Sequence, residues 1–109
     1  MKKAKIDLND FRTTGSKVFT GRAKGGEVRK GSKIDELEAK NDEVEILIPT
    51  DIYSINPSFL EEFLVNVVSK LGENGFKNKF KFVNEGDYKI IKDLEEAVER
   101  ILREENALA

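Results

Sequence analysis

Several short segments of the chain alternate hydrophobic and polar residues or are continuously apolar, and these segments predict β-strands. Residues 3–8 alternate with period two, which predicts a strand with one buried face. Residues 17–20 predict a second strand, and the turn residues between these two segments indicate a β-hairpin with a long loop. Residues 44–48 hold four apolar side chains among five, which predicts a central strand buried on both faces. Residues 80–83 predict a further strand.

A helical pattern of apolar residues follows the central strand. Asn56 is a favourable N-cap, and Pro57 suits the first helical position, where its missing N–H costs nothing. Apolar residues then recur with the spacing of one helix face, and Gly72 provides the stop. They are Leu60, Phe63, Leu64, Val67, Val68 and Leu71. This segment predicts the best-defined helix of the chain.

The segment after the second strand has a weaker helical pattern. Residues 22–31 contain helix formers, but Gly25 and Gly26 each cost about 1 kcal/mol relative to alanine. We therefore expect a short, weak helix there. Ile34 and Leu37 predict only a turn or a short helix after it.

The last amphipathic segment covers residues 88–105 and predicts a final helix. The start of this helix is ambiguous. Residues 88–91 also fit a brief strand, in which case Asp93 would be the N-cap and Glu96 would complete a capping-box-like pair.

The order of the predicted elements is β-β-α-β-α-β-α. Strands that alternate with helices are joined by right-handed crossovers and form mostly parallel sheets. The length of 109 residues is typical of one domain. We therefore expect an α/β fold in a single small domain over residues 1–109, with a four-stranded, mostly parallel sheet and helices mainly on one face.

The composition excludes several kinds of site. The chain has no cysteine and no histidine, so disulfides, thiolate metal sites and histidine-based catalytic triads are excluded. A small hydrolase would need a carboxylate, metal–carboxylate or serine–lysine site, and no motif marks one. No pattern predicts a cofactor or a metal ion.

The hydropathy of the chain bears on its location. No apolar run approaches the ~18 residues of a membrane span. The basic N-terminus is not followed by the apolar region of a signal peptide. A cytoplasmic location is the simplest interpretation.

Charge is distributed unevenly along the sequence. Residues 1–33 hold ten Lys/Arg and three Asp/Glu, a net charge of +7, whereas residues 34–109 carry −9. A basic surface attracts phosphate backbones, so nucleic-acid binding is the alternative function. The basic residues are scattered, however, and balance against the acidic remainder is the favoured interpretation. The residues concerned are Arg12, Lys17, Arg22, Lys24, Arg29, Lys30 and Lys33.

A glycine-rich stretch precedes the weak helix and includes a candidate anion site. Backbone N–H groups of such stretches bind phosphate in some proteins. The spacing here matches neither common phosphate-binding motif, so a flexible turn is favoured. The candidate anion-binding residues are Gly21, Arg22 and Lys24.

Ser58 is the candidate phosphorylation site. It lies in the first turn of the best-defined helix, directly after a central strand and its extension. In an α/β sheet this is the carboxyl-end edge, where binding sites usually form. The helix N-terminus favours a phosphate, whereas Glu61 and Glu62 one turn later would repel it.

Several stretches carry a family resemblance, and together they span about residues 18–102. Through them the chain resembles a family of small bacterial and archaeal STAS-like domains of unknown function. The predicted element order is also similar to the STAS fold of anti-sigma-factor antagonists. The stretches are residues 19–22, 27–30, 46–49 and 51–59.

The resemblance implies a regulatory protein-binding module and not an enzyme. In the antagonists, an Asp-Ser-Ser/Thr-Gly turn opens the helix after the third strand, and its second hydroxyl residue is phosphorylated. The kinase is the partner, a histidine-kinase-type ATPase that acts as the anti-sigma factor. Ser58 matches the phosphorylated position, whereas Asn56, Pro57 and Phe59 depart from the motif.

The resemblance and the predicted helix together define an expected contact surface. It consists of the edge around residues 54–58 and an exposed face of the following helix. We expect reversible docking of a protein there, with phosphorylation of Ser58 as the candidate switch. The partner-binding residues would be Ser54, Asn56, Ser58, Glu61, Glu62 and Asn66.

Overall fold

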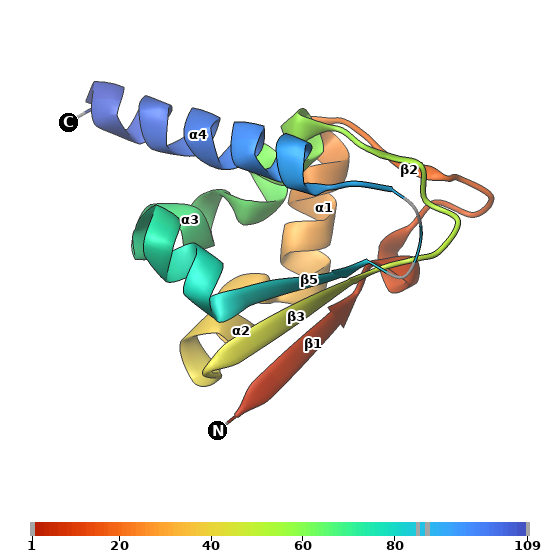
Figure 1. The fold of residues 1–109 in the computed structure, drawn as a ribbon, viewed down its shortest axis with the longest axis horizontal. Helices are drawn as coiled ribbons and strands as arrows, with labels where there is room; N and C mark the ends of the chain where they lie inside the picture. The colour runs from red at the N-terminus through yellow and green to blue at the C-terminus, as the bar shows by residue number, and fades with distance from the viewer. Residues whose placement is uncertain (1, 85, 87, 109) are drawn as a thin grey trace.

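The computed structural model describes residues 2–84, 86 and 88–108 and shows a small α/β domain (Figure 1). In chain order its elements are β1 (Lys3–Asp7), the 3-10 helix η1 (Leu8–Phe11), β2 (Val18–Phe19), α1 (Arg22–Ser32), α2 (Ile34–Lys40), β3 (Glu43–Ile48), β4 (Ser54–Ile55), α3 (Pro57–Lys79), β5 (Phe80–Asn84) and α4 (Ile91–Leu108).

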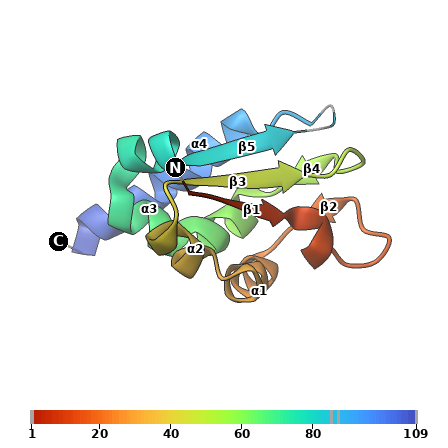
Figure 2. The same ribbon diagram turned by 90° about the horizontal axis from the view of Figure 1, so that it is seen from below.

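The main sheet has the strand order β1-β3-β5, and both strand pairs are parallel. β3 is therefore central, as predicted, and the parallel pairing is confirmed. Figures 1 and 2 show the helices on one side of this sheet. Val44, Ile46 and Ile48 point into the core, whereas the alternate residues of β3 are half-buried. The expectation that β3 is buried on both faces is therefore wrong.

β2 and β4 form a separate two-stranded parallel sheet, in which Val18 pairs with Ser54 and Phe19 with Ile55. The expected hairpin and the expected single four-stranded sheet are therefore wrong. β2 pairs with β4 and not with β1, whose strand partner among the described residues is β3 alone. That pairing buries Phe19 against Phe59, with 5.2 Å between the ring centroids.

α1 forms where the weak helix was predicted, and one of its glycines has a packing role. A Cβ on Gly25 would lie 2.4 Å from the Phe59 carbonyl oxygen on α3, whereas one on Gly26 would meet nothing within 4 Å. Gly25 therefore allows the backbones of α1 and α3 to approach closely. This contact offsets the intrinsic helix cost of the residue.

α2 is a complete short helix that anchors to α3 through a buried carboxylate. Glu38 is 2% exposed and accepts a hydrogen bond of 2.8 Å from Lys70 Nζ, and Lys79 Nζ lies 3.4 Å from its other oxygen. Burial alone would raise the pKa of Glu38, but these two lysines hold the pKa below its usual value.

α3 begins at Pro57 with Asn56 as N-cap, as predicted. Gly72 interrupts it with φ 74° and ψ 175°, but a second helical segment continues to Lys79. The predicted stop is therefore a break within a longer element. The second segment carries Phe76 into the core, where it stacks on Phe80 with 5.0 Å between the ring centroids.

α4 starts at Ile91, and residues 88–90 form no strand. The alternative start with Asp93 as N-cap is therefore wrong, because Asp93 lies in the first turn. α4 packs against α3 through Ala97, Val98 and Ile101, which are all buried. Within the described ranges, no helix is long and apolar enough to span a bilayer.

Candidate functional site

The loops at the carboxyl ends of β3 and β5 meet at one edge of the main sheet, where ligand sites of parallel sheets usually form. A Cβ on Gly86 would lie 2.4 Å from the Thr50 carbonyl oxygen, so the two loops touch there. We call residues 49–58 the rim. It contains β4 and the first two residues of α3.

Backbone hydrogen bonds to β2 and to the residue before it hold the rim in place. Tyr53 N–H donates to the Lys17 carbonyl at 3.0 Å, and Asn56 N–H donates to the Phe19 carbonyl at 2.9 Å. Ile52 and Ile55 are buried between these contacts, whereas the Tyr53 side chain is 69% exposed. The rim therefore presents a large aromatic ring from a constrained backbone.

A bidentate ion pair joins the β1–β2 connection to the rim. Arg12 Nη1 and Nη2 donate to the two carboxylate oxygens of Asp51 at 2.7 and 2.9 Å. These hydrogen bonds lower the pKa of Asp51 and raise the pKa of Arg12. Arg12 therefore has an internal partner and is not a free cation for a phosphate.

The first turn of α3 satisfies its own backbone donors. Asn56 Oδ1 accepts from Ser58 N–H at 2.7 Å, and the N–H groups of Phe59 and Leu60 donate to the Asn56 carbonyl. Pro57 has no N–H. A phosphate at this helix end would therefore find these backbone donors already used. Ser58 itself is half-buried, and Asn56 is exposed.

Glu61 was expected on an exposed helix face, and this expectation is wrong. Glu61 is 4% exposed, and its Oε2 lies 3.4 Å from Arg22 Nη2 and 3.3 Å from Arg100 Nη1. Glu62 is half-buried and pairs with Arg29 Nη1 at 3.0 Å. Both carboxylates lie at the junction of α1 with α3, because α1 packs on the face that was assigned to solvent.

The remaining expected contact residues are divided between two places. Ser54, Asn56 and Ser58 lie together on the rim. Asn66 is exposed two turns further along α3, about 12 Å from Ser58 along the helix axis. It donates to Asp35 on α2 at 2.8 Å, so it belongs to a different surface.

The candidate anion site is a helix start, as the glycine-rich stretch predicted. Gly21 is the N-cap of α1 and has φ 87°. Arg22 pairs with Glu61, and Lys24 Nζ lies 3.0 Å from the Glu27 carboxylate. Both cations therefore have carboxylate partners within the protein, and anion binding stays a prediction.

The basic residues considered for nucleic-acid binding do not form one uncompensated surface. Arg12, Arg22, Lys24 and Arg29 each form a salt bridge with a carboxylate. Their positive charge is therefore balanced locally. The other three, Lys17, Lys30 and Lys33, are exposed.

Tyr88 is a site residue that the sequence did not reveal. Its hydroxyl donates to the Ile55 carbonyl at 3.0 Å and also contacts the Asp93 carboxylate. Burial raises the pKa of Tyr88 to about 12, and Asp93 contributes in the same direction. Besides the nearby Asp93, this environment requires a contact across 33 positions, and no local pattern marks that contact.

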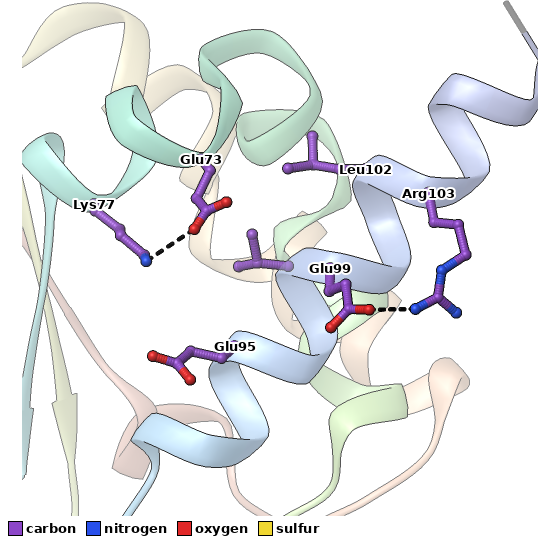
Figure 3. Close-up of a pocket in the computed structure, with 7 residues that line it drawn as sticks. Glu73, Lys77, Glu95, Glu99, Leu102 and Arg103 are labelled. Atoms are coloured by element: carbon purple, nitrogen blue, oxygen red, sulfur yellow. Dashed lines mark hydrogen bonds and ion pairs between the residues drawn. The ribbon is translucent and has the colours of Figure 1, made fainter.

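A groove along α4 is the second feature that sequence patterns did not indicate. One wall is α4, and the other is β5 with the second segment of α3. Its larger end is an open space of about 870 Å³. Figure 3 shows the other end, where Lys77 pairs with Glu73 on α3 and Arg103 with Glu99 on α4. Lys77 and Glu95 line both ends.

The described side chains form no recognisable metal centre. Among residues 2–84, 86 and 88–104, no three His, Cys, Asp or Glu residues are placed to hold one ion. The carboxylates at the α1–α3 junction are instead engaged by arginines.

Comparison of the chain with known protein families, curated proteins and solved structures finds no match. The resemblance to STAS-like domains is therefore a hypothesis that rests on the sequence stretches alone. The three-stranded and two-stranded sheets do not reproduce the expected four-stranded order. What the fold establishes is a small α/β domain with parallel sheets.

Proposed function

We propose that this chain is a non-enzymatic regulatory module of the STAS-like type that binds another protein through its rim. The observation that supports this most is Tyr53, which is 69% exposed on a backbone that β2 and the core fix. Exposed aromatic residues on a rigid frame are typical anchors of protein interfaces, because little conformational entropy is lost when they are buried.

The polar neighbours of Tyr53 fit the same role. Ser54, Asn56 and Ser58 follow Tyr53 on the same short segment and offer further hydroxyl and amide groups on the rim. A central aromatic residue with a polar surround is the usual organisation of an interface. As the resemblance implies, the proposed partner is a histidine-kinase-type ATPase.

Phosphorylation of Ser58 is the proposed switch. A phosphate adds a charge of about −2 at neutral pH. The backbone N–H of Ser58 already donates to Asn56, and Pro57 offers no donor. The added charge would therefore face the partner and change docking more than it changes the fold.

The experiment is capture of proteins from a nuclease-treated lysate of the native host, with the wild-type chain and two variants as baits. Tyr53→Ala removes the proposed anchor. Lys40→Ala is the control, because Lys40 is exposed on α2 and borders neither the rim nor the α4 groove. We expect a stoichiometric protein that the wild type and Lys40→Ala retain and Tyr53→Ala loses.

Two results would contradict this proposal. A protein retained equally by all three baits would show that the rim is not the docking surface. Recovery of nucleic acid alone from untreated lysate, with affinity that falls steeply as salt rises, would favour the basic N-terminal third.

The switch is tested with Ser58→Asp, and Ser58→Ala is its control. We expect Ser58→Asp to weaken binding of the captured protein and to leave the melting temperature nearly unchanged. A parallel loss of binding and of thermal stability would instead show that Ser58 has a structural role.

A further inference from the structure

β5 is an outer strand of the main sheet. It pairs with β3 on one side, and the described residues add no strand on the other. Figure 2 shows β5 as the outer strand on this side of the sheet, with the start of α4 behind it. The free edge of an outer strand presents unpaired backbone N–H and C=O groups, which makes it a template for another strand.

The open face of the sheet carries charges that alternate in sign across the strands. Lys5 on β1 pairs in register with Glu45 on β3, and Glu45 pairs with Lys81 on β5. Opposite charges in directly facing positions stabilise neighbouring strands. The next position in this row, beyond Lys81, favours an acidic residue.

The next two rows of paired residues along the sheet end in apolar residues on β5. On the helix side, Ile46 pairs with Phe82, which is half-buried and lines the α4 groove. On the open face, Leu47 pairs with Val83, which is 36% exposed. Both rows therefore end in apolar side chains at the edge of the sheet, and both favour apolar neighbours.

We propose that β5 accepts an extended segment of a partner protein as an additional strand of this sheet. The segment places an acidic residue opposite Lys81 and apolar residues opposite Phe82 and Val83. The residue opposite Phe82 enters the α4 groove. Main-chain hydrogen bonds supply affinity, and these alternating side chains supply specificity. This surface is distinct from the rim and does not depend on the function proposed there.

The charge of the edge favours an acidic partner over a second copy of the chain. The described charged residues that line the larger end of the groove are Lys77, Lys81, Lys89, Lys92 and Glu95. Residues 80–84 contain no acid, so pairing of two β5 strands would leave Lys81 without an opposite charge. Glu85 and Asp87 lie outside the described residues.

The test selects random displayed peptides on the wild-type chain after depletion on the Lys81→Glu variant. We expect enriched peptides to share an acidic residue next to two apolar residues. In NMR titrations of the labelled chain, these peptides should shift the backbone amides of residues 80–84. Lys81→Glu should weaken their binding about tenfold, and exchanging the acid of the peptide for lysine should restore it.

Lys5→Glu is the matched control. Lys5 faces the same Glu45 from the opposite side, so both variants disturb the sheet alike, but only Lys81 lies at the proposed edge. Peptide binding should survive Lys5→Glu. Failure to enrich any peptide, enrichment of peptides without an acid, or equal loss in both variants would overturn the proposal. A dimer of the chain that Lys81→Glu strengthens would overturn it in favour of a second copy.

Discussion

The Tyr88 hydroxyl lies 3.0 Å from the Ile55 carbonyl oxygen and joins two residues 33 positions apart. Ile55 ends β4 and directly precedes the N-cap of α3, whereas Tyr88 precedes α4. The contact therefore fixes the entry of α4 against the rim. It also removes the phenol from full solvent contact, which has a measurable consequence at high pH.

Stability should fall at alkaline pH because of Tyr88. The pKa of Tyr88 is about 12 in the folded chain, whereas its ordinary value is 10.0, so folding favours the neutral phenol. The resulting stabilisation of the folded chain is fully present below pH 10 and is lost as the pH rises towards 12. Urea unfolding of Tyr53→Phe across this range should show the decline, because Tyr88 is then the only tyrosine. Adding Tyr88→Phe should flatten the curve, and an unchanged curve would contradict the assignment.

The adjacent glycines of α1 should respond to alanine with opposite signs. Gly25→Ala forces its Cβ against the α3 backbone and should destabilise the chain by about 1–3 kcal/mol. Gly26→Ala meets nothing within 4 Å and should stabilise it by up to about 1 kcal/mol through helix propensity. Free energies of unfolding from urea titrations test the pair. Effects of the same sign would show that the α1–α3 approach is not as close as described.

Acid should destabilise the chain through Glu38. Burial alone would raise the pKa of Glu38, but Lys70 and Lys79 hold this pKa below 4.5. The ionised carboxylate therefore stabilises the fold above pH 4.5. This stabilisation is lost as the pH falls through the lowered pKa. Glu38→Gln should be less stable than the wild type at neutral pH, and the difference should narrow below pH 4.5. Glu36→Gln, at an exposed position of the same helix, should keep the wild-type pH dependence.

Removing the charge of Glu61 should cost stability although no catalytic role is assigned to it. Glu61→Gln leaves Arg22 and Arg100 without their shared buried carboxylate, and we expect a loss of about 1–2 kcal/mol in the free energy of unfolding. Glu99→Gln is the control, because its pair with Arg103 is exposed on both sides and should matter little. Equal effects would show that burial of Glu61 contributes nothing.

Features that depend on neighbouring residues in the sequence could be predicted from the sequence alone. The start of α3 could be predicted because Asn56 and Pro57 act within one helical turn. The central position of β3 was predicted from its apolar run, although only one face of the strand is fully buried. The pairing of β2 with β4 could not be predicted, since each is only two residues long and neither shows a periodicity.

The location of the rim at the carboxyl-end edge of the sheet could be predicted, but not all of the residues around it. The rim lies where strand and helix order placed it, and it holds Ser54, Asn56 and Ser58. Glu61 was misplaced because one helix face of α3 was assigned to the core and the next face to solvent. Two further helices cover that second face, and helical periodicity carries no information about them. The long-range contact of Tyr88 escaped prediction for the same reason.

The break at Gly72 divides α3 into two parts with different neighbours. The first part packs against α1, whereas the second stacks Phe76 on Phe80 of β5. Hydrogen bonding does not run continuously through a residue with φ 74° and ψ 175°, so opening of one part need not propagate into the other. In native-state amide exchange, α3 should therefore behave as two cooperative units with a boundary at one residue, and its second part should open together with β5.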